Sequence, residues 1–151
     1  MDLALTSSAF EPGSEIPSRY TCDGSDVAPA LRWSGAPAGT KSFALVMDDP
    51  DAPHGTWVHW VVVDLPPSAT SLPEGGALPQ GGARSGTNSW NRAGYGGPCP
   101  PSGRHRYFFK LYALDTVLPQ LAKPNKEQLE SAMTGHILAQ AQLMGTYQKK
   151  R

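Results

Sequence analysis

Short apolar segments along the chain predict β-strands. Residues 42–47 (Ser-Phe-Ala-Leu-Val-Met) form a nearly continuous apolar run, which is typical of a buried strand. Residues 57–63 (Trp-Val-His-Trp-Val-Val-Val) are rich in aromatic and β-branched side chains. Regular alternation would place His59 on the same face as Val61 and Val63. Both faces of this second segment are apolar, so it is predicted to be a central strand.

Residues 106–114 predict a third clear strand, and residues 30–33 (Ala-Leu-Arg-Trp) a shorter one. Every second side chain of the longer segment falls on one face, namely His105, Tyr107, Phe109, Leu111 and Ala113. Alternation points Arg106 to the opposite face. His105 is therefore expected at the mouth of this strand.

The C-terminal part of the chain has a different pattern. Residues 124–133 predict a helix in which Asn125 caps the N-terminus and Gln128 returns the hydrogen bond. Gly135 can end this helix. Residues Ile137 to Tyr147 are ambiguous, because Ala, Gln and Leu favour a helix while their alternation has the period of a strand.

The composition favours a β-rich fold with shaped loops, because 15 prolines and 16 glycines are too many for a helical bundle. At 151 residues, the chain is expected to form one domain spanning residues 1–151. Residues 66–97 are mostly irregular, and long loops of this kind are often functional. Lys plus Arg equal Asp plus Glu at 13 each, which argues against a nucleic-acid partner and requires any anion site to be built locally.

The N-terminus lacks the basic and apolar regions of a signal peptide, and no stretch approaches the roughly 20 apolar residues of a membrane span. The sequence therefore predicts a soluble cytoplasmic protein without stable membrane insertion. Two cysteines are too few for a disulfide scaffold, and in the cytosol they would ordinarily stay reduced. Cys22 and Cys99 are nevertheless the only pair in the chain, and we expect their Cα atoms to lie within the roughly 7 Å that a disulfide allows.

Two carboxylates flank a proline just before the second strand. Pro50 fixes its own backbone angle and biases Asp49 towards an extended conformation, so Asp49 and Asp51 are held in a defined turn. Taken alone, such a turn is often only a surface feature. His59 is more informative, because a histidine inside an apolar strand needs a hydrogen-bond partner or a cavity. The aspartates at the strand's entrance can supply that partner.

A second loop, residues 95–107, runs Tyr-Gly-Gly-Pro-Cys-Pro-Pro-Ser-Gly-Arg-His-Arg-Tyr. Its paired prolines stiffen the backbone, its glycines permit close approach, and backbone amides in such loops can hold an anion. The loop delivers His105 and Tyr107 to the start of a strand. Residue types in this pattern point to a small polar pocket at one edge of the sheet.

Other chemistries fit the residues less well. Two histidines and two carboxylates could bind a divalent metal, yet the spacing matches no zinc motif, and residues 48–51 lack the glycine and terminal glutamate of a calcium loop. No metal site is expected. Cys99 could also act as a nucleophile with His105 as its base, but their separation in space is not readable from the sequence.

The motifs Asp-Pro-Asp-Ala-Pro, His-Trp and His-Arg-Tyr occur in this order through the centre of the chain. Together they resemble the two signature regions of the phosphatidylethanolamine-binding protein family, in its short bacterial form sometimes called Raf kinase inhibitor-like. The resemblance implies a mainly antiparallel β-sandwich with Greek-key-like topology and short peripheral helices. It also favours a strand for residues 137–147 and a cis peptide bond between Ala52 and Pro53.

The resemblance further implies a non-enzymatic binding protein without a cofactor, whose pocket accepts phosphate-type anions or phosphorylated head groups. The residues that match the family pocket are Asp49, Asp51, His59, Tyr95, Gly97, Pro100, Pro101, His105 and Tyr107. Arg106 matches the family arginine next to the pocket histidine. Because alternation points it to the opposite face, we expect it to be structural and to bond the long loop. Larger animal members carry an additional C-terminal helix for which the sequence leaves no room, which weakens the expectation of lipid binding and kinase regulation of the animal type.

Three functions remain open at this point, the third of which is a hydrolase. The first is binding of a small phosphorylated or anionic ligand, with or without a regulatory role; a zwitterion such as phosphoethanolamine would also satisfy the two carboxylates. The second is a protein-interaction module that inhibits a protease or kinase through the loops between Pro66 and Pro101.

Overall fold

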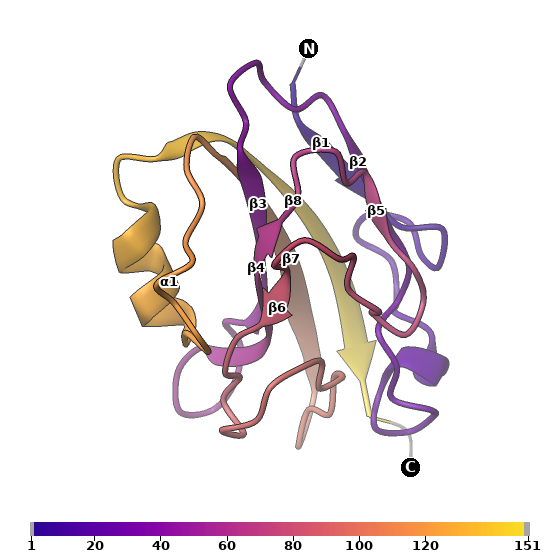
Figure 1. The fold of residues 1–151 in the computed structure, drawn as a ribbon. Coiled ribbons are helices and arrows are strands. Elements are labelled where there is room, and N and C mark those ends of the chain that lie inside the picture. The colour runs from indigo at the N-terminus through magenta and orange to yellow at the C-terminus, as the bar shows by residue number, and fades with distance from the viewer. Residues whose placement is uncertain (1, 150–151) are drawn as a thin grey trace.

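The computed structural model describes residues 2–149 and shows two antiparallel sheets. The larger sheet has the order β6-β4-β3-β7-β8, and the smaller has the order β1-β2-β5 (Figure 1). The strands of the large sheet are β3 (Ser42–Asp49), β4 (Trp57–Leu65), β6 (Arg84–Ser85), β7 (Arg104–Leu114) and β8 (Ile137–Gln148). The strands of the small sheet are β1 (Ala4–Thr6), β2 (Leu31–Ser34) and β5 (Ser71–Leu72). The predicted antiparallel β-sandwich is confirmed.

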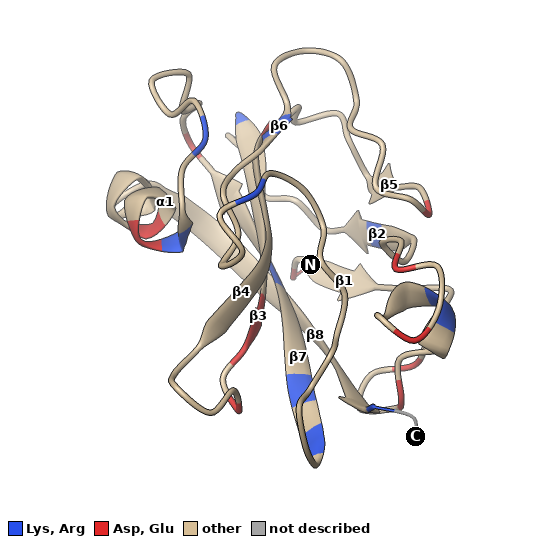
Figure 2. Cartoon of the chain, turned by 90° about the horizontal axis from the view of Figure 1, so that it is seen from below, with Lys and Arg blue, Asp and Glu red and all other residues tan. Residues whose placement is uncertain are grey.

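The elements stack in layers (Figure 2). The helix α1 (Lys126–Met133) covers one face of the large sheet, and the small sheet lies on the other face, near the single-turn 3₁₀ helix η1 (Ser18–Tyr20). The larger core lies between the two sheets and includes Trp33, Trp60 and Phe109. A second core, which contains Val61 and Leu129, lies between the large sheet and α1.

Strand β3 lies between β4 and β7, so the chain must cross from one side of β3 to the other after β4. Residues 66–103 make this crossing, and a long return connection of this kind is the mark of a Greek-key plan. The crossing carries the irregular stretch that the sequence predicted. Its end delivers the second signature loop to the start of β7, beside the turn between β3 and β4.

The predicted helix forms with the predicted cap. Asn125 Oδ1 accepts from the backbone of Gln128 at 2.8 Å, and the Gln128 side chain accepts from the backbone of Asn125 at 3.0 Å. Leu129 and Met133 face the second core. Lys126 Nζ lies 3.1 Å from the buried Asp48 Oδ2, which ties the helix to β3. At eight residues, α1 is also the longest helix within residues 2–149, and it falls far short of a membrane span.

Residues 137–147 form a strand, as the resemblance implied. Their helix-forming side chains matter less than their alternation, because Ala139, Ala141 and Leu143 pack against the core between the sheets. Burial of one face thus overrides the intrinsic preference for a helix. The same alternation in β7 places Tyr107 and Phe109 on the core face, as predicted.

One prediction about β4 is wrong. Met47 pairs with Trp60 and Asp48 with Val58, so His59 is the additional residue of a β-bulge. The bulge breaks the regular alternation: Val58 and Val61 both contribute to the core under α1, whereas His59 contacts Tyr107 on the opposite face. His59 therefore does not share a face with Val61 and Val63.

The cis bond expected at Pro53 is also contradicted, because residues 2–149 contain no cis peptide bond. The trans form is the default even before proline. The turn after β3 is instead organised by Asp49, whose Oδ1 accepts from the backbone N–H of Asp51 at 2.8 Å. This local hydrogen bond is the usual device by which an aspartate stabilises a turn.

Candidate ligand-binding site

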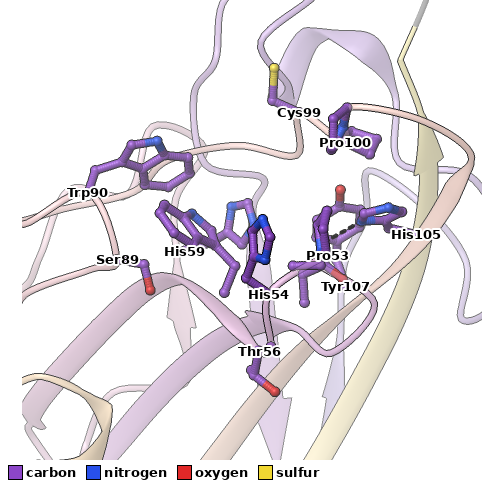
Figure 3. A pocket seen from close by; sticks show the side chains of 15 residues that line it. Pro53, His54, Thr56, His59, Ser89, Trp90, Cys99, Pro100, His105 and Tyr107 are labelled. Atoms are coloured by element: carbon purple, nitrogen blue, oxygen red, sulfur yellow. Dashed lines mark hydrogen bonds and ion pairs between the residues drawn. The ribbon is translucent and has the colours of Figure 1, made fainter.

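A pocket of about 630 Å³ opens where the turn between β3 and β4 meets the loop that precedes β7 (Figure 3). Such a volume is typical of small-molecule sites. Six of the nine predicted site residues line it, namely Asp49, His59, Pro100, Pro101, His105 and Tyr107. Segments far apart in the sequence thus converge on one cavity, because β3, β4 and β7 are neighbours in the sheet.

His105 and Asp49 form a buried pair. Nδ1 of His105 lies 2.6 Å from Asp49 Oδ2, and the side chains are 8% and 4% exposed. The carboxylate accepts at Nδ1, so the imidazole keeps a proton there and leaves Nε2 available to a ligand. The other oxygen of Asp49 is already held by the backbone N–H of Asp51. Asp49 is therefore committed to two partners within the protein.

His59 is held differently. Its Nδ1 lies 2.7 Å from the carbonyl oxygen of Gly96, which can only accept, so Nδ1 carries the proton. Burial lowers the pKa of His59, outweighing the Gly96 hydrogen bond and the nearby carboxylates, which raise it. The ring is therefore neutral near pH 7, and Nε2 is an acceptor. His59 cannot supply the positive charge for an anion, whereas it can accept a hydrogen bond from a hydroxyl or ammonium group.

Tyr107 lies between the two histidines. Its ring stacks on His105 with an interplanar angle of 24° and meets His59 edge-on at a centroid distance of 5.2 Å. Burial raises the pKa of Tyr107, and the charges of Asp49 and Asp51 raise it further. The hydroxyl stays protonated and can donate a hydrogen bond to an anion.

Pro100 and Pro101 form another wall of the cavity, and Figure 3 shows Pro100 across from Pro53 of the β3–β4 turn. Cys99 is joined to Cys22 by a disulfide with a Cα–Cα distance of 5.5 Å, which confirms the predicted proximity of the two cysteines. The crosslink connects this wall to the segment that follows η1.

Tyr95 and Gly97 lie outside the cavity and hold the same loop from behind. The hydroxyl of Tyr95 donates to the carbonyl oxygen of Tyr20 at 2.7 Å, and Gly97 N–H donates to Asp26 Oδ1 at 2.8 Å. A Cβ at Gly97 would lie 2.3 Å from that same Asp26 oxygen. Only glycine therefore fits at this position without displacing the loop.

Asp51 also lies outside the cavity. It forms a two-pronged ion pair with Arg106, with Nε–Oδ2 and Nη2–Oδ1 distances of 2.9 Å each. The hydrogen bond from Arg106 is the largest cause that lowers the pKa of Asp51 to about 2. Arg106 thus has the structural role that the resemblance implied, although its partner is the β3–β4 turn rather than the long loop.

The structure adds pocket residues that the motifs did not identify. Trp57 and Trp90 meet edge-to-face at a centroid distance of 5.4 Å, and Trp90 also contacts the edge of His59 at 5.1 Å. Pro53 and His54 form the lip (Figure 3). Trp57 and His54 could have been suspected from their position beside the first motif, whereas Trp90 comes from the long loop and gave no signal.

The pocket has no evident metal centre. Within residues 2–149, no three histidine, cysteine or carboxylate side chains come together closely enough to hold a metal ion. The arrangement instead offers a hydrogen-bond donor at Tyr107, ring nitrogens at His105 and His59 and an apolar rim.

A model of the phosphatidylethanolamine-binding protein family matches residues 6–148. The chain belongs to this family. A relative named UPF0098 protein from Methanothermobacter thermautotrophicus is 50% identical over 149 residues, which cover 96% of this chain and 98% of the relative. A UPF0098 protein from Aquifex aeolicus is 48% identical over 154 residues, covering 97% and 89% of the two chains.

Solved structures of family members have the same fold. A putative phosphatidylethanolamine-binding protein homolog from Chlamydia trachomatis superposes with a TM-score of 0.93 at 44% identity, over 99% of both chains. E. coli YbcL, described as a new member of the mammalian family, gives 0.91 at 34% identity over 99% of this chain and 100% of YbcL.

Proposed function

We propose that this protein binds a small ligand carrying a phosphate-type anion in the pocket between the β3–β4 turn and the loop before β7. It binds this ligand without catalysing a reaction of it. The observation that carries the proposal is the buried pair of His105 and Asp49 at the wall of an open cavity. A buried carboxylate that fixes one imidazole nitrogen also orients the other nitrogen.

The charges of the pocket support an anion once the internal pairs are counted. Asp49 would repel an anion if it were free, but it is bonded to His105 and to the backbone of Asp51. Asp51 is bonded to Arg106. The hydroxyl of Tyr107 and, in its charged form, the imidazole of His105 are then the donors that remain for a phosphate group, and such charge-assisted hydrogen bonds are the strong ones.

The rest of the cavity favours a ligand larger than inorganic phosphate. Its 630 Å³ would leave room for an organic group beside the anion, against the apolar rim of Pro53, Trp57 and Trp90. The unprotonated nitrogen of His59 can accept from a hydroxyl or ammonium group on that part of the ligand. Phosphoethanolamine, with an anion at one end and an ammonium at the other, is the simplest probe of this arrangement.

The test is a calorimetric titration of the protein with phosphoethanolamine and with inorganic phosphate. The proposal expects saturable binding that His105→Ala weakens. His136→Ala is the matched control, because His136 forms a similar pair with Asp115 but on the exposed surface, outside the pocket. The proposal would be contradicted if neither ligand binds, or if His105→Ala and His136→Ala lose the same amount of affinity. Release of phosphate from either ligand would contradict its non-enzymatic part.

The cellular compartment in which the protein acts is also a proposal. Disulfides persist in oxidising compartments and are rare in the cytosol, so the redox state of Cys22 and Cys99 in cells tests the cytoplasmic localisation expected from the sequence. Rapid alkylation of cell extracts would distinguish free thiols from the crosslinked form. Inhibition of a protease or kinase through the rim loops remains a prediction of the sequence.

A further inference from the structure

Strand β8 ends the large sheet and presents an open edge. Its neighbour on one side is β7, and it is the last strand in the order β6-β4-β3-β7-β8. Near its C-terminal end this edge is covered, because Ile16 N–H donates to Thr146 O at 2.8 Å and Thr146 N–H donates to Ser14 O at 3.0 Å. Gly13 N–H donates to Met144 O at 2.7 Å. These bonds show that the backbone of residues 144 and 146 points away from β7.

The same alternation points the backbone groups of Gln140 and Gln142 away from β7. Within residues 2–149, no backbone group from outside the sheet bonds to either residue. Both side chains are exposed, and Ile137 and Leu138 are large apolar residues that are 42% and 41% exposed. Unpaired donors and acceptors in an extended row are a template for another strand.

The composition of β8 lacks the features that usually protect such an edge. Its 12 residues, Ile-Leu-Ala-Gln-Ala-Gln-Leu-Met-Gly-Thr-Tyr-Gln, include no charged residue and no proline. In Figure 2, β8 is tan along its length, whereas the adjacent β7 carries blue segments. Natural sheets commonly discourage edge pairing with lysine, proline or short strands. A neutral edge can meet a second copy of itself without repulsion between like charges.

The order of side chains is self-complementary about Ala141. When two copies of residues 139–143 run antiparallel with a twofold axis at Ala141, Gln140 lies opposite Gln142 of the second copy. Ala139 then lies opposite Leu143, so apolar residues meet apolar residues and amides meet amides. Two features limit the pairing to this part of the strand: the bulge at Leu138, which the register with β7 skips, and the hydrogen bond that Met144 O accepts from Gly13.

We propose that the β8 edge, residues 139–143, pairs with the same edge of a second copy to form an antiparallel dimer with its twofold axis at Ala141. The two five-stranded sheets then continue into one another. The backbone groups of Gln140 and Gln142 bond to the second copy, which satisfies both residues. This interface is independent of the proposed ligand site, since His105 pairs with Tyr147 at the other end of β7 and β8.

The test is sedimentation velocity over a range of protein concentrations, with two double variants at exposed positions. In Gln140→Glu with Gln142→Glu, each introduced carboxylate faces a carboxylate of the second copy, and the dimer dissociation constant is expected to rise by roughly tenfold or more. In Gln140→Lys with Gln142→Glu, opposite charges face each other twice. This matched variant is expected to dimerise at least as tightly as the parent protein.

Amide hydrogen exchange provides a second readout. The N–H groups of Gln140 and Gln142 are expected to become protected as the concentration rises, while those of Ala139 and Ala141 face β7 and are protected throughout. A parent protein that stays monomeric, a dimer unaffected by the double glutamate variant, equal weakening in both variants, or open-ended assembly would each overturn the proposal. Phosphoethanolamine binding should be unchanged in both variants, so failure here is distinct from failure of the proposed ligand site.

Discussion

Arg106 and Asp51 are joined by both side-chain nitrogens and by the backbone, since Arg106 N–H also donates to Asp51 Oδ2 at 3.0 Å. The preceding residue, His105, holds Asp49 on the opposite face of β7. Two consecutive residues of β7 therefore hold two carboxylates of the β3–β4 turn, one pair buried and one exposed. The exposed pair fixes the turn, and the buried pair faces the ligand cavity.

Replacing Arg106 by Gln should lower the stability of the protein at neutral pH, and the difference from the parent should shrink as the pH falls towards 2. The pKa of Asp51 is lowered to about 2 in the folded state, so its stabilising effect is present above the unfolded value of about 3.9 and is lost as the pH falls towards 2. Arg106→Gln should reduce this loss. Thermal melts of both proteins between pH 5 and pH 2 measure it; identical slopes would contradict the prediction.

The sequence predicted much of this region because its signals are local. The alternation in β7 and the cap of α1 depend on neighbouring residues, and both are found as expected. The bulge at His59 was not predictable, because it depends on which residues of β3 lie opposite. The position of Asp51 outside the pocket was not predictable either, because it depends on an ion pair with an arginine 55 residues away in the sequence.

His59 should make the protein less stable in acid. Burial lowers the pKa of His59 in the folded state, because the folded protein stabilises the neutral ring relative to the charged ring. Stability is therefore full above the unfolded pKa of about 6.5 and falls as the pH drops from there to the lower folded pKa. His59→Asn keeps a side-chain N–H near Gly96 O and should remove this part of the acid sensitivity.

Thermal melts at pH 7.5 and pH 5 test this prediction, with His136→Asn as the control at an exposed histidine outside the pocket. The His59 variant should lose less stability on acidification than the parent, and the control should behave like the parent. An NMR titration that finds His59 protonated above pH 6.5 would contradict the argument.

Reduction of the Cys22–Cys99 disulfide should destabilise the fold. The two residues are 77 positions apart, and releasing a loop of this length typically costs about 2–4 kcal/mol through the greater freedom of the unfolded chain. Denaturant unfolding with and without reductant measures the difference. The double variant Cys22→Ser with Cys99→Ser should have the same free energy of unfolding as the reduced parent, with or without reductant. If the reduced parent is as stable as the oxidised one, packing alone holds the loop.

Binding of phosphoethanolamine should depend on Asp49 through His105 rather than through the charge of Asp49 alone. Asp49→Asn keeps the shape of the side chain but removes the carboxylate that holds Nδ1 of His105 at 2.6 Å. His105→Ala removes the donor itself. Because a hydrogen bond to a charged group contributes about 1.5–3 kcal/mol, we expect each variant to weaken binding by roughly 10- to 100-fold near neutral pH.

A comparison of two ligands separates the two roles. If Asp49 acts by holding His105, Asp49→Asn should weaken the binding of phosphoethanolamine and of inorganic phosphate, as His105→Ala does. Calorimetric titrations of the parent and of both variants with both ligands make the comparison. If Asp49→Asn binds inorganic phosphate more tightly than the parent, Asp49 repels the anion and does not position the histidine.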